Sequence, residues 1–251
     1  MTSNGRKVTA STLQKPVRNH YFFGKKLDVQ HFELEQDYFN AKRWLLNRLV
    51  SGFGVVCGLN VGWADPHTYD AIVVKPGLAI DKWGREIILI RDSMPVKIMP
   101  PAPGECPPGE ENFIYICLEY FECLADPAPV LATECNGGQR CMPDTIQERY
   151  KITVKPCKAP EIGHRCQIPD IIDDSSGEII YDTIVRWVSE RCPSRPEDPC
   201  IPLAEIEFDE SGHCSDIDIT VRPIVYTNDL LFEILLGITE RRETPRPGGK
   251  Q

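Results

Sequence analysis

Apolar side chains recur with a helical period over residues 29–50. Phe32, Phe39 and Leu46 are spaced seven residues apart, which places them on one face of an α-helix. Asp28 precedes this pattern and is a favourable N-cap, because its carboxylate can accept a hydrogen bond from the first helical turn. Glycines follow the last apolar position, as is common at helix C-termini. The pattern therefore predicts a long helix near the start of the chain.

Short apolar runs separated by tight-turn residues follow this helix. Such spacing is typical of short strands that pair with their neighbours along the chain. Pro76-Gly77 suits the central positions of a type II turn between two of the runs. The expected strands cover residues 55–61, 71–75, 78–81 and 85–91. They predict an antiparallel β-domain directly after the helix.

The second half begins after a proline-rich segment at residues 95–110. Residues 113–121 form the strongest strand pattern of the chain, and residues 145–155 are a plausible partner. Further elements are expected as a short helix over 181–190, strands over 201–208 and 217–221, and a final helix over 229–236 that Gly237 ends. The expected fold class is α+β. A long N-terminal helix leads an antiparallel β-domain, and a cysteine-rich β region and a C-terminal helix follow it.

Four regions follow from these patterns. Residues 1–20 are expected to form a flexible basic arm, and residues 21–110 the helix with its β-domain. Residues 111–225 form the cysteine-rich β region, and residues 226–251 hold the last helix and a polar tail expected to be disordered.

Net charge separates the arm from the rest of the chain. The whole chain carries −9, while residues 1–18 hold four basic side chains and no acidic one, so the remainder carries −13. An acidic body argues against nucleic acid as a partner, since phosphate binding needs a basic surface. No apolar stretch is long enough for a membrane span or a signal peptide. The chain is therefore expected to be made in the cytoplasm without a signal peptide.

Eleven cysteines are many for a cytoplasmic chain, and they raise the possibility of a structural zinc site. Zinc needs four thiolate or imidazole ligands, and Cys135, Cys141, Cys192 and Cys200 are the candidates. Their spacing is wider than in common zinc sites, so disulfides formed after release and free thiols remain alternatives. Cys57 and Cys117 lie inside strand patterns and are expected to be small buried side chains.

Catalytic patterns are missing from the sequence. It contains no Gly-x-Ser-x-Gly, no His-Glu-x-x-His and no phosphate-binding Walker loop, and its five histidines are scattered. We therefore do not expect an enzyme.

Several motifs together resemble a bacterial family encoded near contractile, phage-tail-like injection systems. They are similar as well to N-terminal regions of phage baseplate and tail-fibre proteins. The motifs lie at residues 18–27, 32–39, 42–43, 47–49, 54–59, 75–81, 84–87, 222–223 and 230–235. The family has no activity that could be carried over to particular residues.

This resemblance implies a structural component of a contractile injection particle, at its baseplate, spike or tube end. Such a protein would dock onto other particle proteins, would form a homo-oligomer, and would assemble in a cytoplasmic or lysis-released particle. The residues expected to dock are Tyr21, Phe22 and Phe23 in the segment before the helix, and Phe32, Phe39 and Leu46 on its apolar face. The alternative is a zinc-stabilised binding module for a surface or glycan partner.

Overall fold

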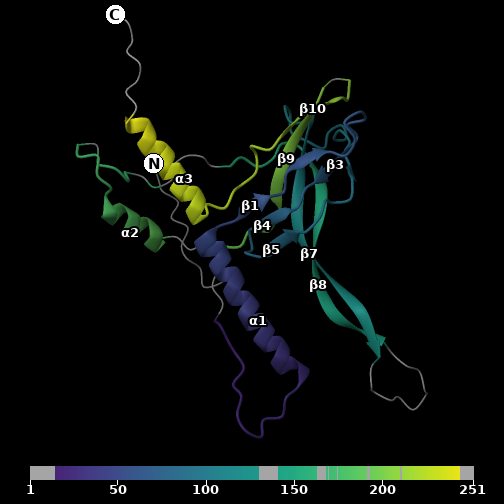
Figure 1. The fold of residues 1–251 in the computed structure, drawn as a ribbon, viewed down its shortest axis with the longest axis vertical. Coiled ribbons are helices and arrows are strands. Elements are labelled where there is room, and N and C mark those ends of the chain that lie inside the picture. Colours follow the sequence, from purple (N-terminus) through teal and green to yellow (C-terminus); the bar gives the residue numbers. More distant parts are fainter. Residues whose placement is uncertain are drawn as a thin grey trace, which may run out of the picture.

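The protein has an α+β fold, as the sequence predicts (Figure 1). The computed structural model describes residues 15–129, 141–162, 168, 170–173, 175–190, 193–209 and 211–243. Its elements are α1 (Val29–Leu46), the π-helical turn η2 (Asn47–Ser51), β1 (Gly54–Gly58), β2 (Val61–Trp63), β3 (Ala71–Val74), β4 (Gly77–Ile80), β5 (Glu86–Leu89), β6 (Val96–Lys97), β7 (Phe113–Pro129), β8 (Cys141–Pro156), α2 (Tyr181–Glu190), β9 (Ile201–Phe208), β10 (Cys214–Asp218) and α3 (Asn228–Glu243).

Three antiparallel sheets form the body of the molecule. Their strand orders are β1-β4-β5, β2-β3-β6 and β10-β9-β7-β8. Buried side chains from all three sheets belong to one hydrophobic cluster, which includes Ile72, Ile87, Ile116 and Leu203. Residues on both sides of the expected boundary at residue 110 therefore share this core.

Helix α1 begins where the sequence predicts. The Asp28 carboxylate accepts a hydrogen bond from the Val29 amide at 2.7 Å, and His31 Nδ1 accepts one from the Asp28 amide at 3.1 Å. These two reciprocal bonds satisfy amides that the first helical turn leaves without partners. The regular helix ends at Leu46, and the wider turn η2 completes the predicted span.

The β7–β8 hairpin is longer than its sequence pattern predicts, and its outer part projects from the body (Figure 1). Prolines at both outer ends resemble loop sequence, but in a two-stranded ribbon each strand keeps one open edge, where a missing N–H is tolerated. Leu124 and Ile146 pair across this outer part, and both are largely exposed. Among the described helices, none combines the length and apolarity that a bilayer span requires.

Candidate docking helix and its anchor

Helix α1 lies near the β-sheets with its C-terminal end and projects away from them (Figure 1). The Asn47 side-chain amide donates hydrogen bonds to the Gly84 carbonyl at 2.9 Å and to Glu86 Oε1 at 2.8 Å. Arg43 Nε lies 3.1 Å from the same Glu86 oxygen. The base of the helix is thus held on the loop between β4 and β5, where both Asn47 and the loop belong to the motifs described above.

Gly84 lets the helix approach this loop closely. Its φ is +92°, and a Cβ at this position would lie 2.0 Å from the carbonyl oxygen of Trp44 in the last turn of α1. No real Cβ contact is this short, and L-residues with side chains rarely adopt this φ. Only glycine therefore fits between the loop and the helix.

Asp81 organises the same loop from inside the protein. Its side chain is fully buried and accepts hydrogen bonds from the amides of Trp83 at 2.8 Å and Arg85 at 2.9 Å. Arg85 Nε donates a third bond to Asp81 at 2.7 Å. The Arg85 guanidinium lies 4.5 Å from the ring centres of both Trp83 and Tyr120. Burial raises the pKa of Tyr120, and the hydrogen bond from its hydroxyl to Glu122 raises it further. The Tyr120 hydroxyl therefore stays neutral beside the cation.

The chain after β10 supports the exit from the helix. Gly54, with φ of +133°, has space for no Cβ, which would lie 2.5 Å from the backbone of Pro223. Val55 donates its amide to the Pro223 carbonyl at 2.8 Å, and its own carbonyl accepts from Val225 at 2.9 Å. The motifs at residues 54–59 and 222–223, which are far apart in the sequence, therefore meet where the chain leaves η2.

The predicted docking side chains of α1 are exposed. Phe32, Phe39 and Leu46 are 51%, 62% and 60% exposed, and no residue of α1 is buried. An apolar face on a surface helix normally packs on its own body. Within the described residues this face has no such cover.

The segment before α1 brings further aromatic side chains beside the helix. The Tyr21 hydroxyl donates a hydrogen bond to Glu35 of α1, and this bond raises the Tyr21 pKa. The ammonium of Lys25 lies 5.7 Å from the Tyr21 ring centre and 6.0 Å from that of Phe22. Phe22 and Phe23 are both exposed. The structure thus joins the two predicted docking groups through one contact, while docking itself remains a prediction.

Helix α3 carries an exposed apolar surface that the sequence reasoning missed. The prediction that Gly237 ends the helix is wrong, because α3 continues to Glu243. A glycine inside a helix costs only about 1 kcal/mol, which neighbouring turns can offset. The sequence could have indicated this surface, because apolar residues before Gly237 occur all around the helix and leave it no continuous polar face. Those exposed are Leu231, Phe232, Ile234, Leu235, Leu236 and Ile238.

The cysteines do not gather into the predicted zinc site among the described residues. Cys200 forms a disulfide with Cys117, so its sulfur is not a thiolate ligand, which corrects its assignment. Cys141 is an exposed free thiol, and Cys135 and Cys192 lie outside the described residues. Within the described ranges, no three candidate ligand side chains stand close enough to hold a metal. A zinc site elsewhere stays a prediction.

Two other cysteine expectations need correction. Cys117 is buried, but as half of a disulfide rather than as a small apolar side chain. Cys57 is exposed, although it lies in β1. An irregularity in the β1–β4 register falls between Val55 and Cys57, and it breaks the alternation that would turn Cys57 inward.

No family model matches the chain, and no curated protein matches it. Solved structures with some likeness include "The baseplate complex from the type VI secretion system", at 12% identity and a TM-score of 0.39, covering 94% of this chain and 72% of that one. "Crystal structure of TssK" has the same identity and TM-score, and the chain spans 51% of its length while 94% of this chain is covered. A cryo-electron microscopy structure of the type VI secretion system TssK-TssF-TssG baseplate subcomplex has 14% identity and a TM-score of 0.41. The match covers 91% of this chain and 71% of that one. Likeness at this level bears on neither function nor partners.

Proposed function

We propose that the protein is a structural component of a contractile, phage-tail-like particle, at its baseplate, spike or tube end. In this role it acts by docking onto other subunits rather than by catalysis. The observation that carries the proposal is the state of α1, which is anchored at its base while its apolar side chains stay uncovered. The motif resemblance described above supplies the kind of particle.

A helix in this state is suited to packing against a second protein. In proteins, most of the stability of a helix comes from the packing of its apolar face against other elements. Full burial of each large apolar side chain contributes about 2 kcal/mol, so Phe32, Phe39 and Leu46 together can drive a specific contact. The joint at Asn47 and Gly84 would fix the direction in which the helix is presented.

Tyr21, Phe22 and Phe23 form a second docking group under the same proposal. Phe22 and Phe23 are exposed, and Tyr21 ties the segment to α1 through Glu35. A neighbouring subunit that covers α1 could therefore enclose these rings as well. The partners would be baseplate, spike or tube proteins together with further copies of this chain, assembled in the cytoplasm or released by lysis.

Sedimentation of native lysate from the source organism tests the proposal. We expect the wild-type chain to pellet with tube and sheath proteins, as mass spectrometry of the fractions would show. A Phe32→Ser/Phe39→Ser variant should reduce the pelleted fraction at least tenfold, because it removes two of the three apolar contacts. Its matched control is Glu33→Ser/Asp37→Ser, which changes two exposed acidic residues of the same helix.

Two outcomes would contradict the proposal. One is a wild-type chain that stays in the light soluble fraction while particles pellet. The other is a Phe32→Ser/Phe39→Ser chain that is folded by circular dichroism and pellets as well as the wild type.

A further inference from the structure

Residues 193–200, which we call the strap, cross the base of α1 without forming a helix or a strand. Three of its eight residues are prolines, which lack a backbone N–H, and its backbone contacts with the helix base and with Trp83 are made through carbonyl oxygens. Pro193 accepts a hydrogen bond from Arg48 Nη1 of η2 at 2.6 Å, and Pro196 accepts one from Trp83 Nε1 at 2.8 Å. The strap therefore connects the helix base to the β4–β5 loop on which that base rests.

A covalent bond holds the other end of the strap. Cys200 is linked to Cys117 of β7, with their Cα atoms 5.8 Å apart. Cys117 has no exposed surface and Cys200 only 2%. The last residue of the strap is thus fixed to the central sheet inside the core, while its first residue contacts η2.

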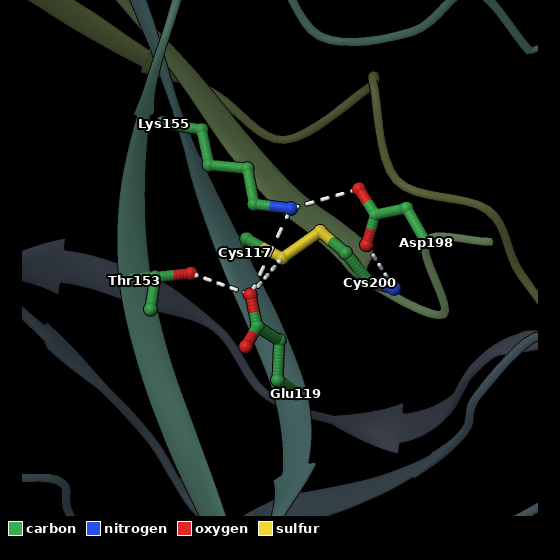
Figure 2. The surroundings of a disulfide bond; sticks show 6 residues. All are labelled: Cys117, Glu119, Thr153, Lys155, Asp198 and Cys200. Carbon is green, nitrogen blue, oxygen red and sulfur yellow. Dashed lines mark hydrogen bonds and ion pairs between the residues drawn. A yellow bond between two sulfur atoms is a disulfide. The ribbon is translucent and has the colours of Figure 1, made fainter.

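Charged side chains surround this disulfide (Figure 2). Lys155 Nζ lies 2.8 Å from Asp198 Oδ2 of the strap and 3.7 Å from Glu119 Oε1 of β7. The Cys200 amide donates to Asp198 Oδ1 at 3.0 Å. Burial would raise the pKa of Asp198, but hydrogen bonds from Lys155 and Cys200 outweigh it and lower that pKa. The strap thus has an ionic attachment beside its covalent one.

We propose that the Cys117–Cys200 disulfide is a redox-dependent lock that holds the strap against the base of α1. In the oxidised protein, the strap keeps its contacts with Arg48 and Trp83, and α1 projects in one direction. In the reduced protein, the pairing of β9 with β7 still holds the end of the strap, but its earlier residues keep only ionic and hydrogen-bonded contacts, and the helix base becomes more mobile. The inference concerns the isolated chain and does not depend on the proposed particle.

Closing the lock needs an oxidant. The two thiols lose two protons and two electrons as the S–S bond forms, and a low-molecular-weight disulfide can accept them. With oxidised glutathione, one molecule is consumed and two molecules of reduced glutathione leave for each bond formed. The product is one cross-link between β7 and the strap.

The second disulfide offers a matched comparison. Cys106–Cys157 joins the proline-rich segment before β7 to the residue that follows β8. Its chain separation of 51 residues is of the same order as the 83 residues between Cys117 and Cys200. It attaches neither the strap nor the helix base, so its loss affects general stability without affecting the lock.

Amide hydrogen exchange of the full chain, measured by mass spectrometry, tests the lock. The samples are the wild type treated with oxidised glutathione, the Cys117→Ser/Cys200→Ser variant and the Cys106→Ser/Cys157→Ser variant. Breaking the Cys117–Cys200 bond should speed exchange about tenfold in residues 44–51 and 82–86. The Cys106→Ser/Cys157→Ser variant should leave those residues as slow as in the wild type.

A further variant and a chemical reduction guard against misfolding. Arg48→Ala removes the contact between strap and helix while both disulfides stay intact, and it should speed exchange in residues 44–51 alone. If the Cys117→Ser/Cys200→Ser variant does not fold, the Cys106→Ser/Cys157→Ser variant is compared before and after reduction with a phosphine, since it keeps the Cys117–Cys200 bond and lacks the other described disulfide. The lock is wrong if peptide mapping finds Cys117 and Cys200 as free thiols after oxidation. It is equally wrong if breaking their bond leaves exchange in residues 44–51 unchanged.

Discussion

Replacing Asp81 by alanine should lower the free energy of unfolding by about 3–5 kcal/mol, because it leaves the cation of Arg85, whose side chain is only 14% exposed, without its buried partner. Arg85 would lose the carboxylate 2.7 Å from its Nε, although its guanidinium stays between Trp83 and Tyr120. The amides of Trp83 and Arg85 would also lose their acceptor. Urea unfolding followed by far-ultraviolet circular dichroism measures the change.

Asp92→Ala is the matched control for this prediction. Asp92 pairs with Lys75 at 2.6 Å, but both side chains are about half exposed. Exposed ion pairs contribute between about 0 and 1 kcal/mol, so the free energy of unfolding of this variant should be close to that of the wild type. If Asp81→Ala and Asp92→Ala lowered the free energy of unfolding equally, the burial of Asp81 would not add to the stability of the protein, and the prediction would be wrong.

Replacing Gly84 by alanine should destabilise the protein by about 2–5 kcal/mol and detach the base of α1. Two costs combine. A side chain at positive φ costs about 1–2 kcal/mol, and the clash with the Trp44 carbonyl adds about 1–3 kcal/mol as the helix or loop shifts. Because the neighbouring atom belongs to the backbone, no side-chain rotation can relieve the contact. We expect faster amide exchange in residues 43–50 as well as a lower urea midpoint.

Gly104→Ala separates these two costs. Gly104 has φ of +82°, close to that of Gly84, but a Cβ at Gly104 would meet nothing within 4 Å. This variant should therefore show only the cost of positive φ, and exchange at the helix base should not change. A Gly84→Ala protein that matches Gly104→Ala in both measurements would contradict the close packing of the loop against α1.

Local patterns in the sequence determined the elements that depend on neighbouring residues. The seven-residue spacing of Phe32, Phe39 and Leu46 was enough to predict α1, because side chains so spaced share one helical face. Short apolar runs between turns were likewise enough to predict an antiparallel β-domain. The sequence did not predict the outer part of the β7–β8 hairpin, because prolines there are typical of a loop. They fit a two-stranded ribbon only because each of its strands has an unpaired edge.

Only the tertiary structure decided how these elements are joined and what stays uncovered. The bonds that hold the helix base link residues 37 and 145 positions apart in the sequence. No local periodicity records such a pairing, and eleven cysteines alone do not reveal which of them pair. The same pattern of apolar residues would also describe a helix packed on its own sheet. Whether that face is buried depends on where the rest of the chain lies, and the described residues leave it exposed.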